Sequence, residues 1–226
     1  MKNQVCALIL AIGMALCGYF IYCGIDNIAN RDRYVTVKGL AEREVMADKA
    51  KWTLSVNVSG NNLEQLYPLL EPKVQAIINY LKKNGVTDDE IIREAPSTED
   101  RSTWYEWEKK MGYMDRYVLT SNLVIVSMNV DNILNIYANQ LDLLKLGAKS
   151  LYINYEYTGL NDLKPEMVEE ATRNARTVAD KFAKDANCSL GSIRTARQGQ
   201  FEVTADDVLL YKRKVRVVTT IDYYLK

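Results

Sequence analysis

Apolar residues return every three or four positions in three stretches of the chain, and this spacing predicts three amphipathic helices. The three stretches are Asn62–Asn84, Asp131–Leu146 and the segment from Pro165 to Ala186. Gly85 and Gly147 follow the first two stretches, as expected where a helix ends in a left-handed conformation. Pro68 and Pro72 fall in the opening turns of the first stretch, so they leave the start of that helix open.

Strands are predicted between these helices, because apolar and polar residues alternate there. In the clearest case, Lys51–Ser59, the side chains of Trp52, Leu54, Val56 and Val58 fall on one side. The other predicted strands are Tyr34–Gly39, Ile91–Ser97, Tyr117–Met128, Leu151–Thr158, Gly191–Gln200 and Leu209–Tyr224. The resulting order, ββαββαβαββ, predicts an α+β fold with mixed, largely antiparallel sheets and helices packed on one side.

The N-terminal part of the chain is more apolar than the rest. Val5–Ile25 contains 21 residues without a charged side chain. As a helix it would measure about 32 Å, close to the roughly 30 Å of a bilayer core. We therefore predict one uncleaved transmembrane helix within residues 1–30 and an α+β region over residues 31–226. The α+β region is long enough for two small subdomains, which we expect to be intertwined.

Two other interpretations of the apolar segment remain open. A cleaved signal peptide normally has a shorter apolar run and small residues at its cleavage site, whereas this run ends in Tyr19, Phe20 and Tyr22. A lipoprotein signal requires small residues before the modified cysteine, but Cys17 and Cys23 both follow bulky residues. An uncleaved anchor therefore fits the sequence best.

The charges beside the segment give a weak signal for its orientation. Arg31, Arg33, Lys38 and Arg43 follow the segment, whereas only Lys2 and the terminal amine precede it. Under the positive-inside rule, this difference favours a cytoplasmic location for the α+β region by a small margin.

The overall composition excludes several classes of function. The chain has 29 basic and 29 acidic side chains, so its formal net charge is zero. Because proteins that coat nucleic acid carry a basic excess or a basic face, no nucleic-acid partner is expected. The chain has no histidine, which removes Ser-His-Asp catalysis and histidine-ligated metals. Cys188 is the only cysteine after the N-terminal segment, so that region has no internal disulfide or thiolate metal cluster.

No residue pattern predicts catalysis or cofactor binding. The members of acidic pairs such as Asp88-Asp89 and Glu169-Glu170 are adjacent, so they point in different directions rather than face each other across a cleft. The glycines of the α+β region occur singly, without the spacing of a phosphate-binding loop. We therefore expect a protein that is not an enzyme and that has no metal or cofactor.

The strongest candidate for a contact surface is the aromatic group Trp104, Tyr105 and Trp107. It lies in the polar stretch Arg101–Asp115, which we predict to be a long loop or a hairpin tip. Because protein interfaces are enriched in Trp and Tyr, one interpretation is contact with a partner or a second copy. The other is that these side chains fold back onto their own sheet.

A weaker candidate is the basic stripe formed by Lys212, Lys214 and Arg216 in the last predicted strand. A basic stripe can meet lipid headgroups or an acidic partner, but lysines also protect exposed strand edges from pairing. We therefore expect a solvated face here. Cys188 follows the third helix, and we expect a small packing residue at this position rather than a redox sensor.

Short motifs follow one another in a characteristic order along the chain. They are Val35–Gly39 with Glu42, Ala47–Ala50, Leu81–Val86 with Asp89–Ile91, Tyr117–Leu123, Gly147-Ala148, and the alanine series Ala171–Ala183 leading to Leu190-Gly191. Together they resemble the SIMPL domain family, which includes YggE-like and periplasmic immunogenic proteins, over roughly Tyr34 to Tyr224. Ala47 and Leu40 stand where the family has a proline and a glycine, which affects local turns more than the fold.

The resemblance implies an exported envelope protein that assembles into homo-oligomers and has no family-wide catalytic residues. It places the α+β region on the periplasmic side of the cytoplasmic (inner) membrane, and we give it more weight than the charge count. Some relatives are linked to oxidative-stress defence. We therefore expect a non-enzymatic, single-pass membrane protein that acts through oligomerisation and contacts with unknown protein partners. The alternative is a small-molecule or lipid-binding module of the envelope, with a pocket between sheet and helices.

Overall fold

The computed structural model of the chain describes residues 11–22, 24, 33–102 and 115–226. Its strands are β1 (Tyr34–Met46), β2 (Lys49–Gly60), β3 (Ile91–Arg93), β4 (Ser97–Asp100), β5 (Tyr117–Ser127), β6 (Ala148–Glu156), β7 (Leu190–Gln198), β8 (Glu202–Ala205) and β9 (Lys212–Leu225). Its helices are α2 (Leu63–Lys83), the short η1 (Asp88–Glu90), α4 (Val130–Ala138), α5 (Leu141–Lys145) and α6 (Leu160–Asp185).

The N-terminal segment is described only in part. Residues 11–22 and 24 are helical, whereas the remainder of the predicted anchor Val5–Ile25 lies outside the described residues. Among the described helices, none is both long enough and apolar enough to cross a membrane.

The chain is divided into two compact units, each assembled from separate pieces of the sequence. Unit 1 comprises Met1–Arg43, Asp162–Val203 and Val215–Lys226. Unit 2 comprises Glu44–Asn161 and Thr204–Lys214. Each unit contains its own sheet.

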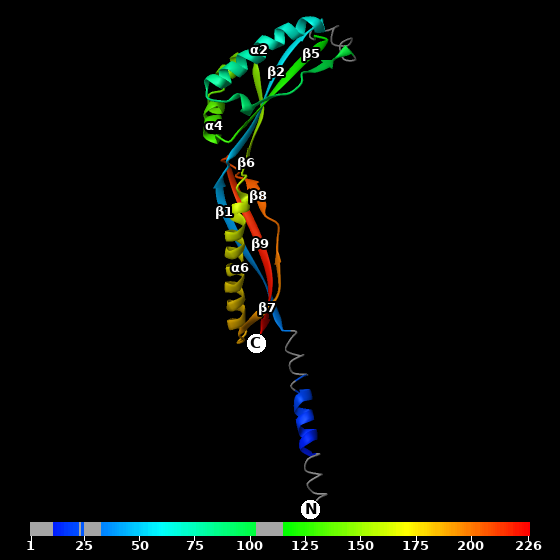
Figure 1. Cartoon of the computed structure of the whole chain (residues 1–226), viewed down its shortest axis with the longest axis vertical. Coiled ribbons are helices and arrows are strands. Elements are labelled where there is room, and N and C mark those ends of the chain that lie inside the picture. Colours follow the sequence, from blue (N-terminus) through cyan, green and yellow to red (C-terminus); the bar gives the residue numbers. More distant parts are fainter. Residues whose placement is uncertain (1–10, 23, 25–32, 103–114) are drawn as a thin grey trace, which may run out of the picture. The chain divides into compact units, whose positions relative to one another are not determined.

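The sheet of unit 1 has the strand order β1-β9-β7, and β8 also pairs with β9 (Figure 1). β1 and β9 run antiparallel, because their contacts step in opposite directions along the two strands. The N–H of Leu225 donates to the carbonyl of Arg33 at 3.0 Å, whereas Arg216 forms an ion pair with Glu42 at 3.5 Å. β7 is also antiparallel to β9, so β9 is the central strand.

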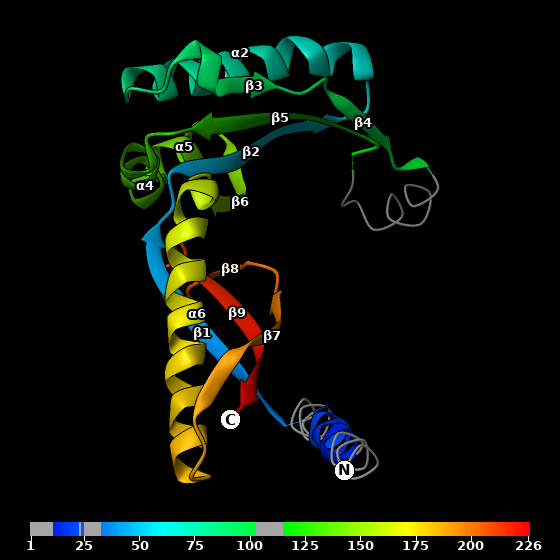
Figure 2. The ribbon, with the colours of Figure 1, turned by 60° about the horizontal axis from the view of Figure 1, so that its bottom comes forward.

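α6 covers one face of this sheet with a stripe of small residues, and Figures 1 and 2 both show it beside β1. Met167, Ala171, Ala175, Ala179 and Ala183 follow one another at intervals of four, and each is at most 2% exposed. Because alanine side chains are short, the helix backbone can approach the strands closely.

Gly39 of β1 is the point of closest approach. A Cβ atom at this position would overlap the carbonyl oxygen of Ala171 and lie 2.6 Å from the backbone nitrogen of Ala175. One residue further along β1, the carbonyl of Leu40 accepts a hydrogen bond from the Asn174 side chain at 2.9 Å. The absence of a side chain at Gly39 therefore fixes how α6 lies on the sheet.

The sheet of unit 2 has the order β3-β5-β2-β6, and β4 also pairs with β5. All of these pairs are antiparallel. Figure 2 shows β2 and β5 side by side, with α2 extending along them. β2 and β5 are therefore the long central strands on which this unit is built.

The core of unit 2 lies between this sheet and its helices. Its largest fully buried side chains are Trp52, Leu54, Leu70, Ile77, Leu81, Leu119, Leu123, Ile125, Ile133 and Leu143. The indole N–H of Trp52 donates to the Ser150 hydroxyl at 2.9 Å, so the one polar atom of this buried side chain is paired. The Trp52 ring also packs edge-on against Tyr137, with 5.8 Å between ring centroids.

An ion pair connects α2 to β3 at the surface of unit 2. The guanidinium of Arg93 donates two hydrogen bonds to the carboxylate of Glu71, at 2.9 and 2.6 Å. These bonds, with a third from Gln75, lower the pKa of Glu71 to about 2. Because both charged side chains are partly exposed, solvent screening keeps the contribution of this pair to stability small.

The structure confirms the predicted α+β class with antiparallel sheets and helices. The expected mixed character is not found, since no parallel pair occurs among the described strands. β1 continues through Gly39 to Met46, because Gly39 provides room for α6 rather than a turn. α2 begins at Leu63, ahead of both prolines, because Asn62 caps it by accepting from the backbone N–H of Glu64.

Other boundaries also differ from the prediction. The second predicted helix is two helices, α4 and α5, because the Asn139 side chain donates to the Asn135 carbonyl and ends the first. The predicted strand Ile91–Ser97 is divided into β3 and β4, and α6 begins at Leu160, before Pro165. β8 was not predicted, because its four residues are all exposed and show no alternation.

We expect Gly39→Ala to lower the free energy of unfolding of the full-length protein by about 1–3 kcal/mol, because the new methyl group forces α6 away from β1. Urea unfolding followed by circular dichroism measures the change. Lys38→Ala is the matched control, since Lys38 is exposed on the same strand, and its effect should stay below about 0.5 kcal/mol. Equal stability of Gly39→Ala and the wild type would show that the helix is not held at this contact.

Candidate functional site

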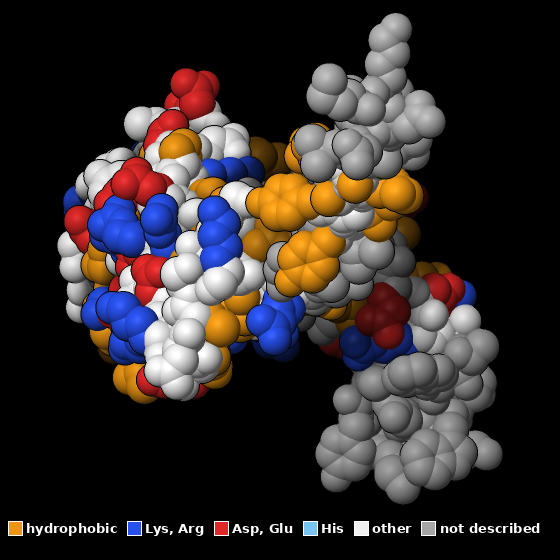
Figure 3. Space-filling model, turned by 90° about the horizontal axis from the view of Figure 1, so that it is seen from below, with side chains coloured by type: hydrophobic (Ala, Val, Ile, Leu, Met, Phe, Trp, Pro, Cys, Tyr) orange, Lys and Arg blue, Asp and Glu red, His pale blue; other side chains and the backbone are white. Residues whose placement is uncertain are grey.

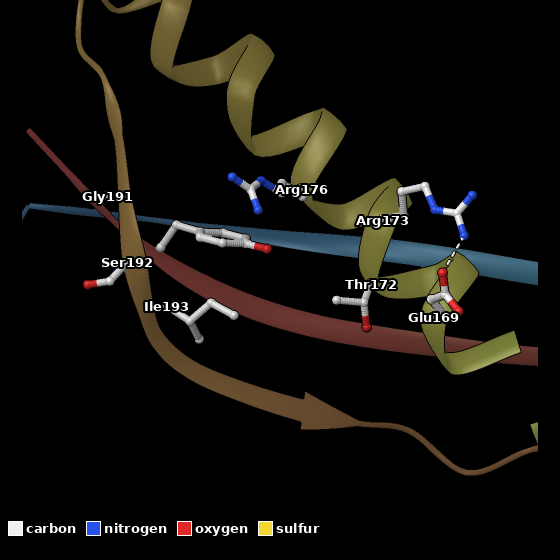
Figure 4. A pocket seen from close by; sticks show the side chains of 8 residues that line it. Glu169, Thr172, Arg173, Arg176, Gly191, Ser192 and Ile193 are labelled. Carbon is white, nitrogen blue, oxygen red and sulfur yellow. Dashed lines mark hydrogen bonds and ion pairs between the residues drawn. The ribbon is translucent and has the colours of Figure 1, made fainter. Parts of the chain in front are cut away.

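Unit 1 contains a cavity of about 560 Å³ beside α6 (Figure 4). Its lining residues are Glu169, Thr172, Arg173 and Arg176 from α6, Gly191, Ser192 and Ile193 from β7, and Tyr223 from β9. The cavity lies where α6, held over β1 at Gly39, leaves the inner side of β7 uncovered, so that Ile193 is 50% exposed. Its volume lies within the range of small-molecule sites.

The two arginines that line the cavity differ in their partners. Arg173 donates to the carboxylate of Glu169 at 2.9 Å, and Figure 4 shows both side chains turned toward each other. Arg176 extends from α6 toward the stretch of β7 at Gly191. It makes no hydrogen bond or ion pair with any residue in the described part of the chain. The charge of Arg176 is therefore the one in the cavity that a ligand can meet.

Tyr223 lies between α6 and the sheet and is only 4% exposed. Burial raises the pKa of Tyr223, and the charge of Arg176 opposes this effect. The phenol is therefore protonated and able to donate, yet it has no hydrogen-bond partner among residues 33–102 and 115–226. The hydroxyl oxygen is not among the fully buried polar atoms without a partner, so an acceptor in the cavity can reach it.

The polar side chains that line this cavity are mostly hydrogen-bond donors. Its hydroxyl groups, on Thr172, Ser192 and Tyr223, form no hydrogen bond to a described carboxylate, so no nucleophile is paired with a base here. Elsewhere in the described ranges, no group of three or more Cys, Asp and Glu side chains could hold a metal ion. The cavity offers donors and one uncompensated positive charge, which suit an anion.

The aromatic group predicted as a contact surface, Trp104, Tyr105 and Trp107, lies outside the described residues. A second cavity, of about 460 Å³, includes Lys73 and Arg101 in its lining. The predicted role of the aromatic group therefore stays a prediction.

The basic stripe is divided between two surroundings, each with acidic neighbours. Arg216 forms its ion pair with Glu42 in unit 1. Lys212 and Lys214 line a cavity of about 360 Å³ in unit 2, together with acidic side chains that include Asp206. Acidic side chains thus lie near the three positive charges, and the solvated face stays a prediction.

Sequence patterns alone did not single out the cavity beside α6. In the sequence, Arg176 is one of several charged residues on the polar side of an amphipathic helix. Tyr223 is one of the alternating residues of the last strand. The two are 47 positions apart in the sequence, and the packing of Ala175 and Ala179 of α6 against Tyr223 of β9 brings them together.

The motifs found in the sequence can now be compared with known proteins. The profile of one family, described as SIMPL, a protein of unknown function (DUF541), matches residues 35–213. The chain belongs to the SIMPL family. A search of curated proteins found no match. The family match spans parts of both units and confirms the resemblance seen in the motifs.

In this SIMPL chain, the motif residues have structural roles. Gly39 and the alanines of Ala171–Ala183 let α6 approach the sheet, and Gly85 ends α2 with a φ of 88°. Gly191, which follows the alanine series in the motif order, lines the cavity. The glycines and alanines of the motifs thus account for helix packing and a helix end in this chain.

Asp48, from the Ala47–Ala50 motif, holds the loop that leads into α6. Its carboxylate accepts hydrogen bonds from the N–H groups of Thr158 at 2.8 Å and Gly159 at 3.2 Å, and from the Thr158 hydroxyl at 2.9 Å. The Asp48 side chain, at the turn between β1 and β2, thus accepts from three donors of Thr158 and Gly159, which lie between β6 and α6.

We expect Asp48→Ala to lower the free energy of unfolding by about 1–2 kcal/mol, because it leaves these donors without their acceptor. Urea unfolding measures the change, and Asp48→Asn should recover part of it by restoring an acceptor oxygen. Asp89→Ala, at an exposed position of η1, is the control. If both alanine variants matched the wild type, Asp48 would not hold the loop.

Proposed function

We propose that this SIMPL protein is a non-enzymatic, membrane-anchored protein of the cell envelope that works by assembling with copies of itself and contacting other proteins. The family match supports a common fold, and the sequence motifs of that fold serve packing. The proposal therefore depends on surfaces rather than on a catalytic site.

The observation that carries the proposal is a row of side chains across the sheet of unit 2, on the face opposite Trp52. Ile92 of β3 pairs with Val124 of β5, Val124 with Thr53 of β2, and Thr53 with Tyr152 of β6. We call Ile92, Val124, Thr53 and Tyr152 the apolar row.

The apolar row has exposed side chains at its two ends and buried side chains in its middle. Ile92 is 53% exposed and Tyr152 is 57% exposed, whereas Thr53 is 5% exposed. The Thr53 hydroxyl has no partner among the described residues. Exposed apolar side chains are typical of protein contact surfaces, and here they stand on β3 and β6, at the two edges of one sheet face, so the row is our candidate for the assembly contact.

The proposed anchor is supported by the sequence of Val5–Ile25 and by the exposed side chains of residues 11–22. Ile12, Met14, Leu16 and Phe20 are each more than 50% exposed. Figure 3 shows hydrophobic side chains gathered in one area, whereas acidic and basic side chains are interspersed elsewhere on the same face. An apolar helix with such side chains all round is suited to lipid.

We further propose that the α+β region lies on the outer side of the cytoplasmic membrane, with a link to oxidative-stress defence. Both statements come from the properties expected of SIMPL proteins. Protease added to intact spheroplasts should digest the region if it faces outward and leave it intact if it faces the cytoplasm.

We expect the double variant Ile92→Glu, Tyr152→Glu to dissociate the assembly. Two charges placed in the apolar row should raise the dissociation constant about 100-fold. Light scattering of the full-length protein in mild detergent, over a range of concentrations, measures the mass of the particle.

Tyr67→Glu is the control, because Tyr67 is 50% exposed on α2, away from the apolar row. This variant should keep the wild-type mass. A wild-type protein that is monomeric at every concentration would contradict self-assembly, and an unchanged mass of the double variant would contradict the choice of surface.

We expect Ile12→Arg with Leu16→Arg to release the protein from the membrane, since each arginine costs about 2.5–3.5 kcal/mol near the centre of a spanning helix. Sedimentation after an alkaline carbonate wash measures the bound fraction, with Ile12→Ala, Leu16→Ala as the control. Intact mass should show that residues 1–25 are retained. Loss of these residues from the mature protein would favour a cleaved signal instead.

A further inference from the structure

We propose that the cavity beside α6 binds the phosphate group of an organic phosphate, with the apolar part of the ligand lying against Ile193. This site is separate from the apolar row of unit 2 and does not depend on self-assembly.

The polar groups of the cavity are donors that lack partners. The guanidinium of Arg176 and the hydroxyls of Tyr223 and Thr172 line one space, and none is hydrogen-bonded to another residue that the structure describes. The side chain of Ser192 points away from Arg176 (Figure 4). A phosphate group carries several acceptor oxygens, so it can accept from an arginine and from hydroxyl groups at the same time. A ligand that is itself mainly a donor would leave these groups unpaired.

The charges around the cavity leave one positive charge in excess. Glu169 is the only carboxylate in the lining, and its charge is offset by Arg173 at 2.9 Å. Asp180 lies one turn beyond Arg176 on α6 but forms no ion pair with it. Arg176 also acts on the Tyr223 hydroxyl more strongly than Asp180 does. An anion next to Tyr223 therefore meets a net attraction.

The size of the cavity shows that phosphate alone would not fill it. The volume of about 560 Å³ belongs to the class that holds small organic molecules rather than single inorganic ions. Ile193, which is 50% exposed, and the ring of Tyr223 provide apolar surface beside the donors. Covering Ile193 with an apolar group removes this surface from water and stabilises the complex.

Such a phosphate could belong to a membrane lipid or to a soluble compound. Gly191 of the lining packs against Tyr224, and the next residue, Leu225, is hydrogen-bonded to Arg33. In the proposed anchored form, Arg33 follows Ile25 by eight positions, which span at most about 28 Å. Lipid headgroups are then within reach of this end of the sheet, so both sources must be tested.

The test uses the full-length protein in nanodiscs of phosphatidylcholine and measures its melting temperature. Phenyl phosphate is the soluble probe, inorganic phosphate tests the anion alone, and nanodiscs containing phosphatidic acid supply the lipid. We expect phenyl phosphate or phosphatidic acid to raise the melting temperature in a saturable way. The apparent dissociation constant should rise about 10- to 100-fold in Arg176→Ala and in Tyr223→Phe.

Arg197→Ala is the matched control, because it removes an exposed positive charge from β7 outside the cavity lining. It should leave binding unchanged. Tyr223→Phe removes a single hydroxyl without a described partner, so it keeps the fold even if Arg176→Ala does not.

The outcomes separate the sources and decide the proposal. Stabilisation by phenyl phosphate that depends on Arg176 and Tyr223 supports a soluble ligand, and the same dependence for phosphatidic acid alone supports a lipid. If inorganic phosphate bound as tightly as phenyl phosphate, the proposed contact between the apolar part of the ligand and Ile193 would be wrong. No stabilisation by any probe, or stabilisation that Arg176→Ala and Tyr223→Phe leave unchanged, would overturn the proposal as a whole.

Discussion

The contact between Gly39 and α6 is the constraint on which the architecture of unit 1 depends. With no side chain on Gly39 and only methyl groups on Ala171 and Ala175, the helix backbone rests almost directly on β1. Because α6 is held over β1, it does not cover β7. The cavity beside α6 is therefore a consequence of the same packing that stabilises the unit.

The sequence predicted the elements whose patterns are set by burial on one side. The buried apolar side of β2 and the alanine stripe of α6 were both predicted from local spacing, and both are found. The expected alternation of β2 is interrupted, because Thr53 and Ser55 on its other side are buried as well. The predicted ends of helices and strands were less accurate where a single residue has a role that the local sequence pattern does not reveal. Gly39 looked like the end of a strand, because its function depends on a helix more than 120 residues away.

The candidate site was not predictable from local spacing for a similar reason. Arg176 and Tyr223 have ordinary places in their own elements, and it is the packing of α6 against β9 that brings them together. The residues of the SIMPL motifs did not indicate the cavity, because apart from Gly191 they serve helix packing, helix ends and loops. Membership of the family thus indicates a fold, and the surfaces and the cavity of this chain carry its functional hypotheses.

The division of β1 and β9 between the two units limits how the protein can come apart. The chain passes from one unit to the other at Arg43, Asn161, Val203 and Lys214, so neither unit is a continuous piece of sequence. A single proteolytic cut or truncation in the α+β region therefore cannot release an intact unit. The two units are expected to be lost together on heating, as one cooperative transition rather than as two independent domains.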